Sequence, residues 1–248
     1  MKSKNIRSPE KKYFTEKEEI EKIRTAVYGP EGSGVSFISA LAASSAPERL
    51  SVSIAELGRA YFYNALDIGR RFALRGFKSP VSALKNKTSV NDISNTECGL
   101  NWLVKSPEDP ELTNSEIFRF FSRAPGDAVV FDCSGLDAET AFDIAAESDR
   151  VIITVDPLPT ELIKNISLIE RLRLSFPDAI VVINKMNRGV HKAELERFIK
   201  TKNYIEIPFI DPAIIYSCEY RCMLPFENEE IKKLLGKASE ELKSRLFY

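Results

Sequence analysis

The stretch YGPEGSGVSF, residues 28–37, stands between a short apolar run and an apolar segment with helical spacing. Gly29 and Gly34 are separated by four residues, which is the spacing of a phosphate-binding loop. A strand followed by such a loop and a helix directs backbone N–H groups and the positive end of the helix toward an anion. Val35 stands where these loops carry the lysine that binds phosphate. The residues that fit the loop are Gly29, Gly32, Ser33, Gly34 and Ser36.

The rest of the chain alternates strand-like and helix-like segments. Its buried strands are expected to be continuous in Val and Ile because helices cover both faces of a parallel sheet. The predicted strands are 23–28, 50–57, 128–133, 151–156 and 179–184, with weaker candidates at 99–104 and 204–209. The predicted helices are 35–46, 138–148, 160–176 and 228–247. This alternation predicts an α/β fold, a mostly parallel central sheet with helices on both faces.

Length and composition are those of an ordinary globular protein. The 248 residues are 44% hydrophobic and 29% charged, with a formal net charge of −1. A balanced charge gives no global field that would attract nucleic acid or an anionic membrane, so we expect neither partner. No apolar stretch approaches the roughly 20 residues of a membrane span, and the start of the chain lacks the apolar region of a secretory signal. Four scattered cysteines fit the reducing cytoplasm.

Two segments depart from the α/β pattern. Residues 1–22 are charge-rich and predict an N-terminal tail, followed by one domain over 23–248. Residues 78–109 are rich in Asn, Ser, Thr and Pro and predict an insertion or a long surface connection.

Three further stretches carry a family resemblance. Residues 129–172 (VVFDCSGLDAETAFDIAAESDRVIITVDPLPTELIKNISLIERL), 181–187 (VVINKMN) and 207–214 (IPFIDPAI) are similar to the later strands and helices of the ParA/MinD type of P-loop ATPases, the SIMIBI class. The resemblance covers about residues 23–245 and is mostly one of pattern. The chain also resembles degenerate relatives of that family, the TadZ and CpaE proteins found beside Flp-type pilus genes.

The resemblance implies a site for ATP or ADP with Mg²⁺. Ser36 would bind the metal directly, and Asp132, at the end of its strand, would hold it through water. Gly135 would be the glycine whose N–H senses the terminal phosphate. Asn184 would touch the base, and the segment after Pro208 would line it.

Departures from the family pattern fall on charged positions. Pro30 and Val35 replace both lysines of the family's loop, and Glu31 places an acid beside the expected phosphate path. The second strand ends without the family's aspartates, so Glu56 is the nearest acid and a weak candidate for a base. A cation from elsewhere could replace the lysine, because arginine binds phosphate in a bidentate manner. The alternative is that these arginines are solvated helix charges; they are Arg59, Arg70 and Arg71.

Other features indicate no separate chemistry. Asn187 replaces the aspartate of a guanine-reading Asn-Lys-x-Asp motif, so guanine specificity is unsupported. His191 has no recognisable nucleophile partner and is expected at the surface, where a helix begins. The C-terminal helix mixes acids and bases on its polar side, which is typical of a helix packed on its own domain.

These observations predict a degenerate P-loop protein of the ParA/MinD type. Its expected role is that of a scaffold, positioning or regulatory factor with weak or no ATP hydrolysis, which binds ATP or ADP with Mg²⁺ or no nucleotide at all. The alternatives are a slow Mg²⁺-dependent ATPase that uses Ser36 and Asp132, and a sensor that binds nucleotide without turnover. The expected partners are another protein or a second copy of the chain, in the assembly of a pilus, a secretion system or the envelope.

Overall fold

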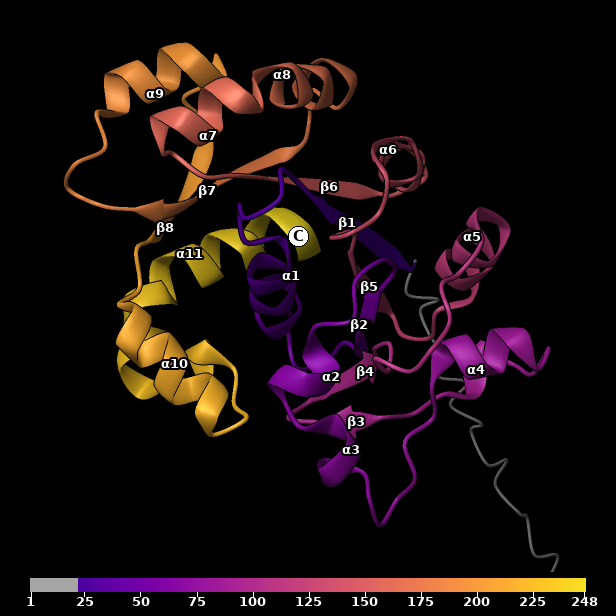
Figure 1. Ribbon diagram of the computed structural model, residues 1–248. Coiled ribbons are helices and arrows are strands. Elements are labelled where there is room, and N and C mark those ends of the chain that lie inside the picture. Colours follow the sequence, from indigo (N-terminus) through magenta and orange to yellow (C-terminus); the bar gives the residue numbers. More distant parts are fainter. Residues whose placement is uncertain (1–21) are drawn as a thin grey trace, which may run out of the picture.

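The computed structural model describes residues 22–248 and has one eight-stranded sheet at its centre (Figure 1). Of the charged tail expected at 1–22, all but Lys22 lies outside the described residues. The sheet order is β3-β4-β2-β5-β1-β6-β7-β8, and only β3 runs antiparallel to its neighbour. The strands are β1 (Ile23–Tyr28), β2 (Val52–Glu56), β3 (Thr96–Glu97), β4 (Leu100–Leu103), β5 (Ala128–Asp132), β6 (Arg150–Val155), β7 (Ile180–Met186) and β8 (Tyr204–Pro208).

Helices cover both faces of this sheet, as the sequence predicts (Figure 1). One face carries α1 (Val35–Ser44), α2 (Phe62–Ala65), α3 (Ile68–Arg71), α10 (Pro212–Tyr220), the 3₁₀ turn η2 (Pro225–Glu227) and α11 (Glu229–Phe247). The other face carries α4 (Pro80–Lys85), the 3₁₀ turn η1 (Val90–Asp92), α5 (Asn114–Arg123), α6 (Ala138–Ala146), α7 (Pro159–Lys164), α8 (Ile166–Ser175) and α9 (Lys192–Ile199).

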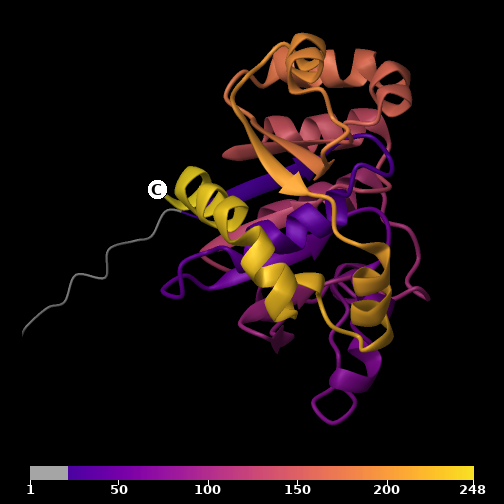
Figure 2. The same ribbon diagram turned by 90° about the vertical axis from the view of Figure 1, so that its left-hand side faces the viewer.

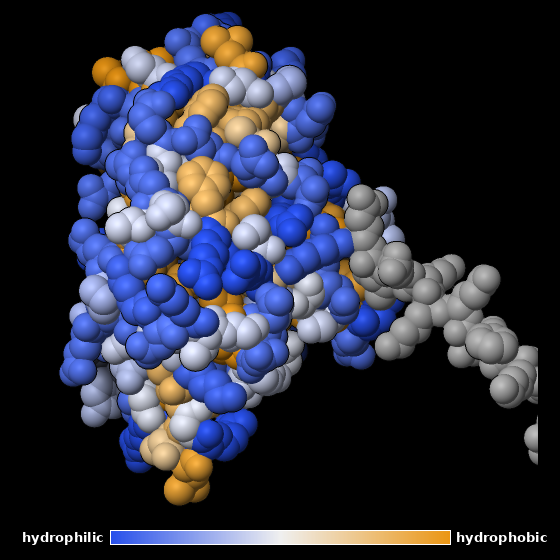
Figure 3. Space-filling model, turned by 90° about the vertical axis from the view of Figure 1, so that its right-hand side faces the viewer, coloured by the Kyte–Doolittle hydropathy of each residue, from blue (hydrophilic) through white to orange (hydrophobic). Residues whose placement is uncertain are grey.

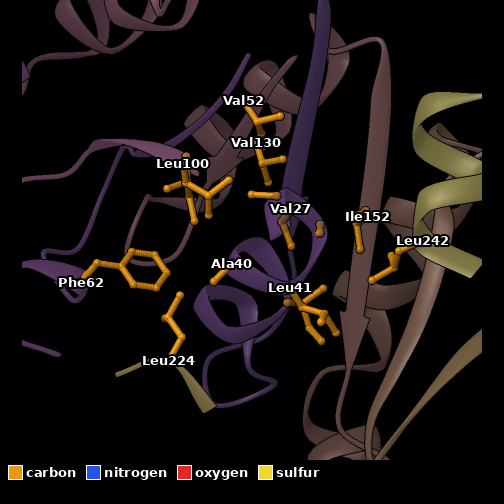
Figure 4. Close-up of a cluster of buried hydrophobic side chains, with 14 of the residues drawn as sticks. Val27, Ala40, Leu41, Val52, Phe62, Leu100, Val130, Ile152, Leu224 and Leu242 are labelled. Carbon is orange, nitrogen blue, oxygen red and sulfur yellow. The ribbon is translucent and has the colours of Figure 1, made fainter. Parts of the chain in front are cut away.

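Two hydrophobic clusters, one on each face, hold these layers together. Successive residues of a strand point to opposite faces; Val27 and Val130 belong to the cluster around α1, whereas Ala26 and Phe131 belong to the opposite one. Figure 4 shows Ala40 and Leu41 of α1 among side chains from several strands. The C-terminal α11 lies over β8 and beside α1 (Figure 2), as expected for a helix packed on its own domain.

The predicted elements agree with the structure in type and differ in detail. The helix expected over 160–176 is two helices, α7 and α8, which meet at Asn165. Residues 78–109 are more than a surface connection, because they form α4, η1, β3 and β4. β4 pairs with β2 inside the sheet, and its Trp102 is buried. β4 confirms the weaker strand candidate at 99–104.

The face that carries α5 and α6 is mostly hydrophilic, with hydrophobic residues in small separate areas (Figure 3). No helix among residues 22–248 is long and apolar enough to cross a lipid bilayer. The loops that follow the carboxyl ends of β1, β5, β6 and β7 meet at one edge of the sheet, where open α/β sheets bind their ligands.

Candidate functional site

The loop between β1 and α1 has the backbone of an anion-binding turn. Gly32 and Gly34 adopt positive φ angles of 79° and 95°, and the Ser33 N–H donates to the Pro30 carbonyl oxygen at 3.1 Å. α1 begins at Val35 without a side-chain cap. Within residues 22–248, the N–H groups of Gly34, Val35 and Ser36 have no hydrogen-bond partner. They stand at the positive end of α1, an arrangement that attracts an anion.

Close packing against β6 fixes the start of the loop. A Cβ atom on Gly29 would lie 2.2 Å from Thr154 Oγ1 and 2.4 Å from the Thr154 carbonyl oxygen. The Ser33 hydroxyl lies 2.6 Å from the same Oγ1. Thr154 is the polar residue inside the otherwise apolar VIITV run of β6. Gly29 is required here by contact with β6 rather than by φ.

Val35 turns its side chain away from the loop. It is 6% exposed and belongs to the hydrophobic cluster around α1. The position that carries lysine in phosphate-binding loops therefore contributes to the core of this protein. Glu31, by contrast, is exposed at the outer side of the loop.

Asp132 ends β5 beside the first turn of α1 and is 1% exposed. Its Oδ1 accepts from the Ser134 N–H at 2.8 Å, whereas Oδ2 is buried with no hydrogen-bond partner among the described residues. Burial raises the pKa of Asp132, and the Ser36 hydroxyl and the Ser134 N–H act in the opposite direction. The Ser36 and Ser134 hydroxyls lie 3.3 Å apart. Ser36, Ser134 and Asp132 thus form an oxygen cluster at the end of the loop.

The segment after β2 lies against the segment after β5. The Leu57 N–H donates to the Asp132 carbonyl oxygen at 3.1 Å, and the Arg59 N–H donates to the Ser134 carbonyl oxygen at 2.9 Å. Gly135 has a φ of 75°, and a Cβ atom there would lie 2.8 Å from Arg59 Cβ. The ladder between β2 and β5 therefore continues past the strand ends and places Arg59 next to Gly135.

Glu56 is fully buried and bound to the backbone. Its Oε1 accepts from the Tyr61 and Phe62 N–H groups, both at 2.7 Å, and its Oε2 accepts from the Lys105 N–H at 3.0 Å. Burial raises the pKa of Glu56 to about 8, although the three N–H donors favour the charged form. These contacts position the segment that leads into α2. They leave the weak sequence hypothesis of a catalytic base without support.

Two residues at the end of β7 hold the loop by its carbonyl groups. Asn184 Nδ2 donates to the Ser33 carbonyl oxygen at 2.9 Å, and Asn184 Oδ1 accepts from the Lys185 N–H at 2.9 Å. Lys185 Nζ donates to the Gly32 carbonyl oxygen at 2.7 Å and to Asp156 Oδ2 at 2.6 Å. The amide of Asn184 thus binds the loop in this structure, and its contact with a base stays a prediction. Sequence reasoning missed Lys185 as a loop contact, because nothing in NKMN reveals its φ of 59°.

One cavity adjoins the loop, and a second lies next to the first. The first, of about 370 Å³, is lined by Gly34, Asn184 and Pro208 and by a set of aromatic rings. Those rings are Phe37, Tyr61, Phe62, Phe209 and Phe226. The second, of about 540 Å³, lies between α7 and α9 and shares Lys185 and Phe209 with the first. His191 lines the second cavity where α9 begins and is exposed, as predicted.

The candidate cations differ in what they already bind. Arg71 donates to the Leu66 and Cys222 carbonyl oxygens and pairs with Glu97 at 3.5 Å. It is therefore a structural contact rather than a solvated helix charge. Arg70 is exposed on α3. Arg59 is exposed beside Gly135, at the site itself.

Comparison with known proteins shows which solved structures share this fold. No protein-family model matches the sequence, and no curated protein sequence matches it either. Solved structures do match. MinD of Pyrococcus horikoshii, complexed with Mg-ADP, is 13% identical with a TM-score of 0.64, over 92% of this chain and 100% of that one. The chain has the fold of the MinD/ParA P-loop ATPases.

Two further MinD/ParA structures give the same result. The MinC:MinD complex of Aquifex aeolicus is 14% identical with a TM-score of 0.65, over 90% and 96% of the two chains. A plasmid partition protein of Borrelia burgdorferi bound to AMPPNP is 12% identical with a TM-score of 0.62, over 88% and 100%. The predicted fold class, a three-layer α/β arrangement, is confirmed.

The residues of this MinD/ParA-fold site fit a magnesium nucleotide. The buried Asp132 Oδ2 lacks a partner and lies with two serine hydroxyls, a set of oxygens suited to Mg²⁺ and its bound water. The loop N–H groups are open for phosphate. Residues 22–248 contain no group of three or more His, Cys, Asp or Glu side chains arranged for a metal, so a metal here would depend on the nucleotide's own oxygens.

Proposed function

We propose that this MinD/ParA-fold chain binds a magnesium adenine nucleotide at the 28–37 loop and hydrolyses it weakly or not at all. Nucleotide would then act as a ligand that controls a scaffold, positioning or regulatory protein. The observation that carries this proposal is that the loop keeps its open backbone N–H groups but has no charged residue at position 35. The backbone amides that bind phosphate are open, while the residue in the lysine position lies in the core.

Binding is supported by the groups on both sides of the loop. On one side, the aromatic cavity with Asn184 and Pro208 offers ring faces on which a base can stack. On the other side, Ser36 and Asp132 offer the oxygens that a magnesium ion requires. A nucleotide with its base in the cavity would extend its phosphates along the open amides toward these oxygens.

Weak turnover is supported by the missing charge. A cation at the transferred phosphate stabilises the charge that develops in the transition state, and removing such a group lowers rates by about 10³ to 10⁵. Val35 supplies none, and the exposed Glu31 adds a negative charge beside the loop. Glu56, the acid at the end of β2, is bound by three backbone N–H groups and is not free to take a proton from water.

We further propose a protein partner or a second copy of the chain. A MinD relative of the same fold is known in complex with MinC, and the similarity to TadZ and CpaE proteins in sequence pattern suggests a role in pilus, secretion or envelope assembly. The candidate contact surface includes exposed apolar residues that line the cavity between α7 and α9, namely Leu158, Ile163 and Phe209.

Isothermal titration of the protein with MgATP and MgADP tests the proposal. We expect saturable binding with a dissociation constant in the micromolar range. Asp132→Ala should weaken binding in the presence of Mg²⁺ and have little effect in EDTA, because its carboxylate acts through the metal. Absence of binding at high protein concentration would leave a scaffold without nucleotide.

The second candidate is a slow Mg²⁺-dependent ATPase, favoured by the presence of both Ser36 and Asp132 at the site. A phosphate-release assay at high protein concentration distinguishes it from a sensor. Turnover that disappears in Asp132→Ala would establish the enzyme. Binding without release of phosphate in the wild-type protein would establish the sensor.

A further inference from the structure

The proposed nucleotide site lacks a cation in its loop, and most cations nearby are already bound to protein groups. Lys185 donates to the Gly32 carbonyl oxygen and pairs with Asp156. Lys105 is buried, and its Nζ donates to the Gly58 carbonyl oxygen at 2.5 Å. Arg71 is held by Glu97 and by two backbone carbonyl groups away from the loop.

Arg59 differs from these residues in its position beside Gly135 and in having a guanidinium that no other described group binds. Within residues 22–248 its guanidinium has no hydrogen-bond or ion-pair partner, and the residue is exposed. Its backbone is fixed, because its N–H donates to the Ser134 carbonyl oxygen at 2.9 Å. A free, flexible charge therefore extends from a fixed point in the site.

The fixed point lies at the terminal end of the expected phosphate path. The Ser134 hydroxyl is 3.3 Å from the Ser36 hydroxyl at the start of α1. Gly135 has no side chain between its backbone and Arg59, since a Cβ atom there would lie 2.8 Å from Arg59 Cβ. The aromatic cavity, which would hold the base, borders the loop at Gly34 and Asn184 and also reaches Tyr61 and Phe62, in the segment that follows Arg59. A phosphate chain that ran from that cavity past Ser36 would reach Ser134, whose carbonyl oxygen accepts from the Arg59 N–H.

Packing explains why Arg59 can occupy this place. A Cβ atom on Gly58 would lie 2.3 Å from the Ser134 carbonyl oxygen and 2.7 Å from the Leu136 nitrogen. The absence of a side chain at Gly58 lets the segment after β2 lie directly on the segment after β5. Leu57 is buried and Gly58 has no side chain, so Arg59 is the first residue of that segment with an exposed side chain.

We propose that Arg59 supplies the positive charge for the terminal phosphate of a bound triphosphate, in place of the lysine that the loop lacks. The inference rests on the proposed function, since it concerns the same nucleotide site. A guanidinium suits this task because it remains charged at all physiological pH values and binds phosphate oxygens in a bidentate manner.

Titration calorimetry on four proteins tests the role of Arg59: the wild type, Arg59→Ala, Arg59→Lys and Arg70→Ala. Arg70 is a matched control, because it is an exposed arginine eleven positions along the chain whose side chain also has no partner within residues 22–248. We expect Arg59→Ala to weaken MgATP about tenfold, equivalent to about 1.4 kcal/mol, and MgADP less than twofold. Arg59→Lys should retain part of the ATP preference, and Arg70→Ala should change neither affinity.

Two results would overturn the role of Arg59 while leaving the proposed function intact. One is wild-type binding of both nucleotides with no change in Arg59→Ala. The other is an equal loss for ATP and ADP in that variant, which would indicate a general effect on the site. Wild-type protein that binds neither nucleotide would reject both proposals together. Thermal unfolding of Arg59→Ala should match the wild type, because the side chain is exposed, and this confirms that the variant is folded.

Discussion

At position 35 of the loop, this chain has a buried valine where phosphate-binding loops have a charged lysine. Val35 is buried in the cluster around α1, so the first turn of that helix gains a core contact where phosphate-binding loops gain an ammonium group. The backbone around it keeps the conformation that binds anions, because that conformation depends on Gly32 and Gly34 and on the start of α1. Under the proposed function, this single residue would separate binding from catalysis.

Restoring the charge tests this separation. We expect Val35→Lys to strengthen MgATP binding by about tenfold, because the lysine stem can follow the apolar surface while its ammonium group reaches the phosphates. Val35→Met is the matched control, with similar length and no charge. Titration calorimetry measures both variants. Equal affinities for the two would show that an ammonium group at position 35 does not reach a bound phosphate.

The site could be predicted from sequence only where a residue's type reveals its role. The glycines, Ser36 and Asp132 stand at their expected places in the loop and at the end of β5. Lys185 and Thr154 were not predicted as loop contacts, because both reach the loop across neighbouring strands. Such contacts depend on strand order, and the sequence pattern does not contain it.

At the scale of elements, the glycines of this chain differ in whether the surrounding structure leaves room for a side chain. Gly29 follows β1, where a side chain would overlap Thr154, whereas Gly236 lies inside α11 with no atom within 4 Å of an added Cβ. We expect Gly29→Ala to lower the free energy of unfolding by about 1–3 kcal/mol through overpacking. Gly236→Ala should raise it by about 0.5–1 kcal/mol, because alanine favours the helix.

Urea unfolding of the two variants measures these opposite changes. A stable Gly29→Ala protein would mean that β6 can move away from the loop, contrary to the close contact with Thr154. A destabilised Gly236→Ala protein would mean that α11 approaches another element at that point.

Helices and strands could be predicted from the sequence where a long run of residues is buried and therefore apolar. The strands β1, β5, β6 and β7 appear at the predicted places because both of their faces are covered and their residues are continuously apolar. The short helices α2 and α3 were not predicted, since four residues carry no helical period. β3 has two residues and pairs only at the edge of the sheet, which leaves no pattern to read.

For the molecule as a whole, Glu56 links stability to pH. Its pKa is raised by burial from an ordinary value of 4.5 to about 8. Between these values the folded protein holds a proton that the unfolded chain releases, so stability falls as pH rises. The contribution of this group is complete below about pH 4.5 and is lost as pH passes about 8. The buried Asp132, whose pKa is also raised, changes stability in the same direction.

We therefore expect the free energy of unfolding to fall between pH 6 and pH 9. Glu56→Gln should be less stable overall, by about 1–3 kcal/mol, because its amide places a donor against one of the three backbone N–H groups. Its stability should nevertheless depend less on pH over this range. Urea titrations at intervals of one pH unit compare the two slopes. Identical slopes would show that Glu56 does not titrate there.

The two contacts from the end of β7 have a consequence for the thermodynamics of binding. Asn184 and Lys185 hold the Ser33 and Gly32 carbonyl oxygens, while the amides on the opposite side of the loop stay open. The conformational entropy of ordering the loop is therefore spent during folding rather than during association. A ligand would meet a preorganised receptor, and its affinity would reflect contact quality with little penalty for rearranging the backbone.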